Sequence, residues 1–248
     1  MSINIKSINL DNLSDSIEKR CSIRKYQDID IDQNRFDILE EFIGELNKIS
    51  DQVKLHLVKN STQFMSPLLF KFIKHTRASL IIEALPGERP FQDVTIGLLG
   101  QLFVLKATQI DLGTVWLGGD KIFFSSEQAR KVINTQNPCP YVISVGISSQ
   151  DFNPHKRKPT SKLIEDWIDN DELLQKLRLA PSAMNKQPWI FSLSQNTVFI
   201  KPIQKNSSSF LNFVTNWVDC GIAAAHAVVY TKGTEIFITS TELKINFE

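Results

Sequence analysis

The chain has 248 residues, enough to bury a sizeable core as one large domain or two small ones. Its 28 Lys and Arg residues are balanced by 27 Asp and Glu residues, which gives no electrostatic reason to expect a nucleic-acid or membrane-surface partner. The polar N-terminus has no apolar run after a basic start, and the longest apolar stretches, residues 96–105 and 222–230, are too short to span a bilayer, so we expect neither a secretory signal nor a membrane anchor.

The first half of the chain predicts helices and strands in alternation. Asp32 is expected to cap a helix whose apolar side chains keep a helical spacing through Phe36, Leu39, Ile43 and Leu46. The later elements are expected as a strand at 53–58, a buried strand within 78–87, a buried helix at 93–110, a strand at 114–117, a helix at 125–134 and a strand at 140–148.

The pattern starts again after residue 161 with a helix at 171–179, strands at 189–193 and 198–201, a helix at 212–231 and a strand at 235–239. Residues 94–108 match residues 218–232 in helical phase, which places Gly97 over Gly221. Residues 46–58 likewise fall opposite residues 177–193. We therefore expect two related halves, 1–160 and 161–248, facing each other as the subunits of a symmetric dimer do.

The residues present argue against several common kinds of functional site. The stretch GTVWLGGDK lacks the lysine and hydroxyl residue of a phosphate-binding loop, and neither GxGxxG after a strand nor GxSxG is found. The four histidines have no ligand-type partners at metal-site spacing, and His226 is interpreted as a core or interface histidine. Three separated cysteines outside any CxxC pattern fit a reducing cytoplasm.

A short basic segment near the N-terminus is the first candidate binding feature. Arg20, Ser22 and Arg24 alternate, so in an extended backbone their side chains point to the same side. Two guanidinium groups and a hydroxyl on one side suit a phosphate or another planar anion. The alternative is a solvated basic turn, and the same two readings apply to the basic cluster at 155–159.

The second candidate feature is the connector RLAPSAMNKQPWIF, residues 178–191, which joins a predicted helix to a predicted strand. It carries two prolines and several hydrogen-bonding side chains where a short glycine-containing turn would suffice.

Together these motifs resemble the nitroreductase-like family of FMN-dependent oxidoreductases. That family has an R-x-S-x-R segment, an A-P-S-x-x-N-x-Q-P-W connector, a G-L-G-T-type strand entry and a basic stretch ending in R-K-P. Residues 180–189 match every fixed position of the connector. The arginine segment occurs in the first half only and the connector in the second only, which is similar to the single-chain, pseudo-dimeric subgroup of that family.

The resemblance implies an α+β nitroreductase-like fold with two related half-domains that form an internal pseudo-dimer around one FMN. Arg20 and Ser22 would hold the phosphate, Arg157 or Lys158 would complete the anion site, and Arg24 would lie toward the pyrimidine end of the flavin ring. The remaining implied cofactor-binding residues are Leu117, Gly118, Gly119, Pro181, Ser182, Ala183, Asn185 and Gln187, the last of which is alternatively a brace for the connector.

The implied activity is electron transfer from NAD(P)H through flavin N5 to a nitroaromatic, quinone or similar small-molecule acceptor, in the cytoplasm and without a metal. The flavin carries this chemistry, so no side chain is assigned a catalytic role. Reductive dehalogenation, flavin breakdown and non-catalytic flavin binding are the alternatives, with residues 60–77 as a candidate lid. A monomer is favoured over a homodimer because the interface would already lie within the chain.

Overall fold

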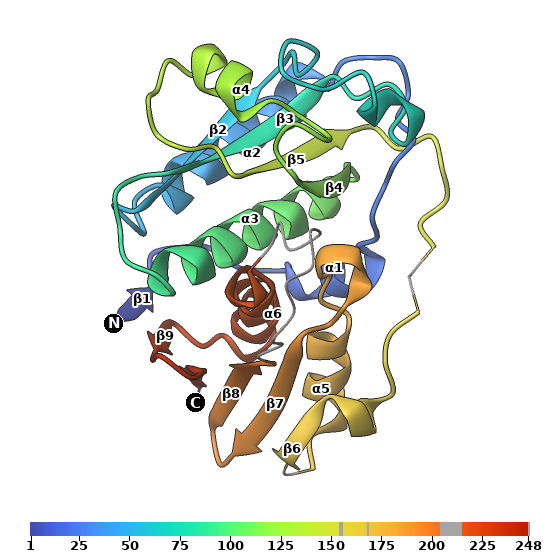
Figure 1. Cartoon of the computed structure of the whole chain (residues 1–248). Helices are drawn as coiled ribbons and strands as arrows, with labels where there is room; N and C mark the ends of the chain where they lie inside the picture. Colours follow the sequence, from blue (N-terminus) through green and yellow to red (C-terminus); the bar gives the residue numbers. More distant parts are fainter. Residues whose placement is uncertain (154–155, 168, 204–214, 248) are drawn as a thin grey trace. The chain divides into compact units, whose positions relative to one another are not determined.

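The computed structural model describes residues 1–153, 156–167, 169–203 and 215–247 (Figure 1). The chain divides into two compact units, the first made of residues 1–18, 88–102 and 156–248 and the second of residues 19–87 and 103–155. None of the helices in the described ranges is long and apolar enough to cross a membrane.

The second unit holds a four-stranded antiparallel sheet. Its strands are β2 (Val53–Val58), β3 (Ala78–Ala84), β4 (Gly113–Gly118) and β5 (Tyr141–Gly146), in the order β2-β3-β5-β4. Every residue of β3 is buried, as the apolar run predicts. The helices of this unit are α2 (Gln33–Leu46), which packs against β2, and α4 (Ser126–Val132). Asp32 caps α2 as expected and accepts from Arg35 N, and Ser125 caps α4 and accepts from Gln128 N.

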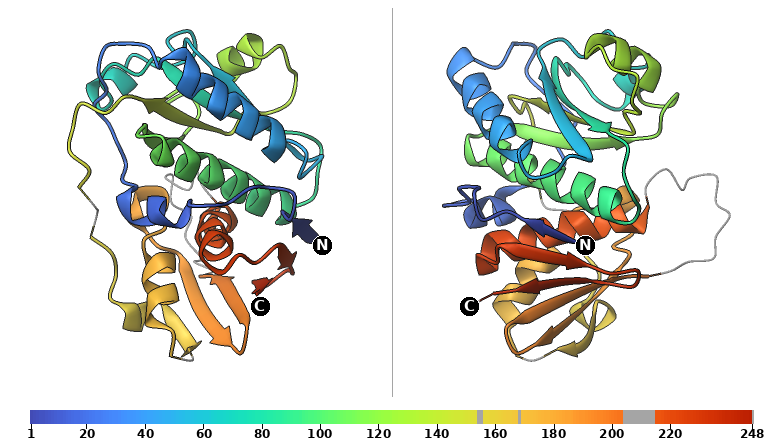
Figure 2. Two further views of the ribbon diagram at one scale, coloured as in Figure 1. Left: turned by 180° about the vertical axis from the view of Figure 1, so that it is seen from behind. Right: turned by 90° about the vertical axis from the view of Figure 1, so that its left-hand side faces the viewer.

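The first unit holds a six-stranded sheet in the order β1-β9-β10-β8-β7-β6. Its strands are β1 (Ser2–Asn4), β6 (Ile164–Trp167), β7 (Trp189–Ser194), β8 (Thr197–Pro202), β9 (Glu235–Ile238) and β10 (Leu243–Asn246). The helices are α1 (Ser14–Lys19), whose last residue belongs to the second unit, α5 (Asp171–Arg178) and α6 (Asn216–Thr231). Helix α6 packs against β7, β8 and β10, and it runs alongside the sheet in the right-hand view of Figure 2.

Two runs of elements in the chain, from α2 to β5 and from α5 to β10, repeat one pattern of helix, two strands, helix and two strands. The order β2-β3-β5-β4 of one sheet corresponds to β7-β8-β10-β9 of the other, and the neighbouring strands in both runs are antiparallel. Helix α4 has no counterpart in the second run. The shared strand order is independent of the sequence match and agrees with it, which supports a relation between the two runs of elements.

The two matched glycines meet at a helix crossing within the first unit. Helix α3 (Phe91–Gln109) contributes residues up to Leu102 to this unit, and it crosses α6 there. A Cβ on Gly97 would lie 3.0 Å from Gly221 Cα and would clash with the Val218 carbonyl oxygen. A Cβ on Gly221 would in turn clash with the Val94 carbonyl oxygen. The absence of a Cβ at both positions therefore lets the backbones of the two helices approach each other closely.

Candidate functional site

The basic segment of residues 20–24 is extended and lies beside β4 in the second unit. Ser22 forms a parallel bridge with Thr114, and Ile23 N donates to the Thr114 carbonyl oxygen at 2.9 Å. Cys21 and Ile23 belong to the buried apolar cluster of this unit, whereas Ser22 is half-buried and Arg24 exposed. The predicted alternation therefore holds from Cys21 to Arg24, while Arg20 is itself buried at 5% exposure.

The segment of residues 117–119, which is predicted to contact the cofactor, lies at the end of β4. Leu117 is buried, Gly118 is the last residue of the strand and Gly119 follows it with a φ of 96°. That φ lies in the left-handed region, which glycine adopts without steric cost. The Gly119 carbonyl oxygen then accepts from Ile122 N at 3.1 Å and from Phe123 N at 3.2 Å, so the chain turns away directly after the strand.

The connector is a tight loop in the first unit. Ser182 closes it by accepting from Gln187 N at its hydroxyl (2.8 Å) and from Asn185 N at its carbonyl (2.9 Å). Met184, Asn185 and Gln187 all have φ near +50°, which is costly for residues other than glycine. Both ends of the loop are buried, at Ala180 and at residues 187–189, and its middle is exposed. The connector thus presents polar groups on a fixed backbone.

The side chain of Gln187 forms hydrogen bonds that hold this loop. Its Oε1 accepts from Lys158 N at 2.8 Å, and its Nε2 donates to the Asn185 carbonyl oxygen at 3.0 Å. Lys158 Nζ also donates to the Gln187 carbonyl oxygen at 3.0 Å. Gln187 is only 2% exposed, so these contacts favour the second of its two sequence interpretations, a brace for the connector.

Arg157 also contacts the connector, which the sequence did not indicate. Its Nη1 donates to Asn185 Oδ1 at 3.1 Å and its Nη2 to the Leu179 carbonyl oxygen at 3.0 Å. Burial, together with the positive charge of Arg178, lowers the pKa of Arg157. The structure therefore brings the basic pair Arg157 and Lys158 together with the connector in one unit.

Asp219 is the residue at this site that sequence reasoning missed. It lies in the first turns of α6, is 2% exposed, and accepts from Ala183 N in the connector at 3.0 Å. Burial raises the pKa of Asp219 to about 7, while the hydrogen bond from Ala183 and the charge of Lys186 act in the opposite direction. The signal in the sequence was a lone carboxylate in the otherwise apolar run VDCGIAAAHAVV.

We expect the buried Asp219 to make the wild-type protein less stable as the pH rises. Its pKa is about 7 in the folded chain against an ordinary 3.8, so between these values the folded state binds more protons than the unfolded state. The contribution of Asp219 to the unfolding free energy is therefore fully present below about pH 4. As the pH rises through 7 this contribution is lost, and the unfolding free energy falls by an amount on the order of a few kcal/mol. Asp219→Asn removes this dependence because an amide does not titrate in this range.

Urea unfolding at pH 5 and pH 8 measures that effect. Between pH 5 and pH 8 the unfolding free energy of Asp219→Asn should rise relative to that of the wild type. The control Asp51→Asn, which changes an exposed residue, should show the same pH dependence as the wild type. Burial also raises the pKa of Asp93. Asp93 is present in both proteins, so its contribution to the pH dependence cancels when the two are compared. Equal pH slopes for wild type and Asp219→Asn would contradict the assignment.

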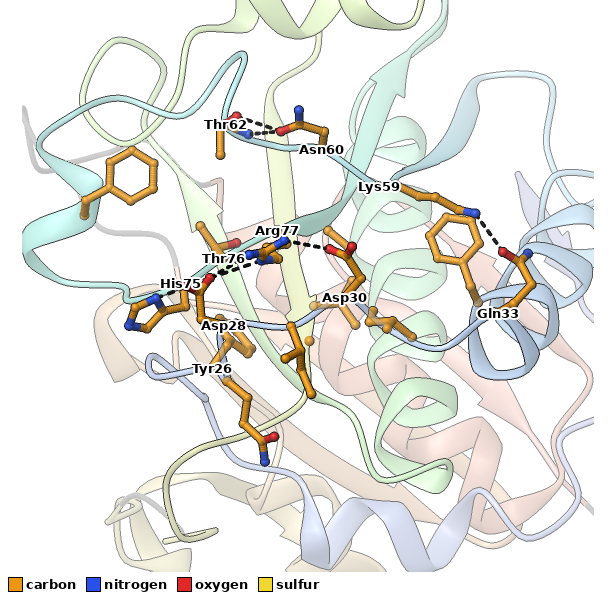
Figure 3. A pocket seen from close by; sticks show the side chains of 18 residues that line it. Tyr26, Asp28, Asp30, Gln33, Lys59, Asn60, Thr62, His75, Thr76 and Arg77 are labelled. Atoms are coloured by element: carbon orange, nitrogen blue, oxygen red, sulfur yellow. Dashed lines mark hydrogen bonds and ion pairs between the residues drawn. The ribbon is translucent and has the colours of Figure 1, made fainter.

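A cavity of about 770 Å³ opens in the second unit and is lined in part by the candidate lid, residues 60–77 (Figure 3). Arg77 is one of the lining residues and donates to Asp28 at 3.0 Å and to Asp30 at 3.2 Å. The hydrogen bonds and charge of Arg77 lower the pKa of Asp28. The volume suits a small molecule, and Phe70 from the lid adds an aromatic wall.

The histidines and cysteines of the described residues form no metal-binding cluster. His226 is fully buried, with Nδ1 2.9 Å from the Lys176 carbonyl oxygen and Nε2 3.0 Å from Gln101 Nε2, which confirms its interpretation as a core histidine. Cys21, Cys139 and Cys220 are buried free thiols. Trp189 and Phe191 are buried and stack on each other at 5.8 Å between ring centroids, so they pack the core of their unit.

Known proteins share this fold. A structure described as a putative nitroreductase from Thermotoga maritima superposes with a TM-score of 0.66 at 19% identity, covering 96% of this chain and 95% of that one. An FMN-dependent nitroreductase from Clostridium difficile gives a TM-score of 0.46 at 19% identity, over 60% of this chain and 92% of that one. A protein from Bacteroides thetaiotaomicron described as a putative NADH dehydrogenase/NAD(P)H nitroreductase gives a TM-score of 0.49 at 16% identity, over 61% of this chain and 95% of that one.

The likeness to the Thermotoga maritima structure and the two matching runs of strands define an α+β protein with the nitroreductase fold. The family described as "Putative TM nitroreductase" matches residues 12–231, most of the chain. The chain therefore belongs to that family, as the connector and the arginine segment predicted. A search of curated proteins found no match.

Proposed function

We propose that this chain is an FMN-dependent oxidoreductase of nitroreductase type that takes electrons from NAD(P)H and passes them to a nitroaromatic, quinone or similar acceptor. The observation that carries the proposal is the connector, which matches every fixed position of the family pattern and adopts a closed, strained and braced loop. Strain of this kind persists where the surrounding structure enforces it, commonly at ligand sites.

The groups present fit a flavin mononucleotide. Arg20 and Arg24 are cations of the type that bind phosphate and stabilise negative charge on a reduced flavin ring, and Ser22 supplies a hydroxyl in the same extended segment. Gly118 and Gly119 leave the backbone at the end of β4 free of Cβ atoms, which permits a planar ring to approach closely.

We assign the remaining contacts as the family resemblance implies them. The connector would contribute to the flavin site through Pro181, Ser182, Ala183 and Asn185, with Gln187 as its brace. Arg157 and Lys158 hold the connector and add positive charge beside it, in the manner expected of an anion site. Leu117 precedes the two glycines in the chain, and its backbone would approach the ring with theirs.

When bound, FMN would supply the redox chemistry by accepting a hydride at N5 and giving electrons to an acceptor. The chain's own contribution is to bind the phosphate, orient the ring and leave one face accessible. No side chain is required as a proton donor. The acceptor chemistry is proposed at the level of nitroaromatics and quinones, and the aromatic and charged lining of the lid cavity is compatible with a polar aromatic molecule.

Anaerobic stopped-flow absorbance tests this proposal. The purified protein, reconstituted with FMN, should show the oxidised flavin spectrum and should bleach on mixing with NADH or NADPH. Addition of a quinone or nitroaromatic should then restore the absorbance. A flavin that neither nucleotide reduces would refute the proposed activity, and a protein that takes up no FMN would mark a scaffold that has lost its cofactor.

A further inference from the structure

Asp219 contacts the connector at its centre. Its carboxylate accepts from Ala183 N at 3.0 Å, directly after Ser182, whose hydroxyl closes the loop, and directly before the strained residues Met184 and Asn185. Asp219 is 2% exposed, so water competes little for this hydrogen bond. A carboxylate that accepts from a backbone N–H makes a stronger bond than a neutral acceptor does.

The other contacts that shape the loop do not titrate near neutral pH. Gln187 N donates to the Ser182 hydroxyl, and Asn185 N and Lys186 N donate to backbone carbonyl oxygens of Ser182 and Ala183. All of these acceptors are uncharged. Among these contacts, the bond from Ala183 to Asp219 is the one whose strength changes with the protonation of its acceptor.

We propose that Asp219 is a positioning residue whose ionised carboxylate fixes the Ala183 amide and so holds the connector in its ligand-binding shape, and whose protonation weakens that hold. For FMN as the ligand this inference rests on the proposed function. For the shape of the connector it stands on the contacts of the first unit alone. The connector is then a segment whose affinity for its ligand changes with pH.

The charged and titratable groups around Asp219 support a transition in the neutral range. Burial raises the pKa of Asp219 to about 7, against the opposing influence of Lys186 in the connector. Cys220 beside it stays a neutral thiol because burial raises its pKa far above 9.0. Asp93 of α3 also reaches this end of α6, where it accepts from the Thr215 hydroxyl at 3.0 Å. A pKa of about 7 places the titration of Asp219 in the neutral range.

The amide resonance of Ala183 tests the positioning without any cofactor. In a ¹³C,¹⁵N-labelled full-length chain it should titrate with a midpoint near pH 7, together with the Asp219 side-chain carboxyl carbon. In Asp219→Asn it should be flat. The matched control Asp93→Asn, which removes a buried carboxylate that contacts Thr215 instead, should keep the wild-type titration. An Ala183 amide that does not follow the Asp219 carboxyl in the wild type, or that still titrates in Asp219→Asn, overturns the proposal.

The dissociation constant of FMN at pH 6 and pH 8 tests the consequence for binding. If FMN binding lowers the pKa of Asp219 by about one unit, binding is roughly fivefold tighter at pH 8 than at pH 6 from this group alone. The second ionisation of the FMN phosphate adds a component that wild type and Asp219→Asn share, so the difference between the two isolates Asp219. An identical pH dependence in both proteins overturns the inference for FMN. Absence of FMN binding at either pH refutes the proposed function instead, and the Ala183 titration then decides the inference.

Discussion

Replacement of Arg20 by alanine should raise the dissociation constant of FMN by about 10- to 100-fold, because a charge-assisted contact to phosphate is worth roughly 1.5–3 kcal/mol. Arg20 begins the extended segment beside β4 and, at 5% exposure, is held in a fixed environment. The purified variant should be nearly colourless where the wild type carries flavin. Fluorescence quenching of FMN on titration with protein gives both constants.

Two further variants separate loss of charge from loss of structure. Arg20→Lys keeps a cation without the planar fork, so it should bind FMN with intermediate affinity. Arg35→Ala removes an arginine whose partner is the surface residue Asp32, outside the proposed site, and should bind as the wild type does. Flavin content and affinity of Arg20→Ala within twofold of the wild type would show that the phosphate is bound elsewhere.

Alanine at Gly97 or Gly221 should cause the largest loss of stability. Each new Cβ would meet backbone atoms of the opposite helix, which cannot move aside as the end of a flexible side chain can. We expect each variant to lose about 3 kcal/mol or more, and its Tm to fall by roughly 6–12 °C. Thermal unfolding followed by circular dichroism measures the change.

Gly44 provides the matched control for these two glycines. It lies within α2, as Gly97 and Gly221 lie within α3 and α6, but a Cβ there would meet nothing within 4 Å. Gly44→Ala should therefore stabilise the protein by about 0.5–1 kcal/mol through helix propensity alone. A small or stabilising effect of alanine at Gly97 or Gly221 would mean that the two helices are further apart than described.

Most of the longer elements were predictable because one periodicity dominates each of them. Helix α2 and strand β2 form at the expected positions, and the buried helix predicted at 93–110 is α3. The helix predicted at 212–231 is α6 from Asn216 onward, and residues 212–214 of that prediction lie outside the described residues.

Three of the four shortest strands among the described residues were missed, and their length gives the reason. Strands β1, β6 and β10 have three or four residues each, too few to establish an alternation. β1 exists through its pairing with β9, and β10 through its pairing with both β8 and β9. Helix α1 has only six residues and is likewise too short to show a period.

The candidate site was predictable as a set of motifs and not as a set of contacts. The connector is recognisable from its fixed residues, but nothing in its sequence shows that Met184, Asn185 and Gln187 adopt positive φ or that Arg157 donates to Asn185. These features depend on long-range contacts such as the one from Asp219 in α6. The residues assigned to the flavin from each half remain predictions.

The claim that one chain binds one flavin is tested most directly by native mass spectrometry of the chain after incubation with FMN. The account predicts a mass increase of one FMN per chain, whatever the oligomeric state, because the arginine segment and the connector each occur once in the sequence. A chain that binds no FMN, or an assembly with a ratio other than one FMN per chain, would contradict it.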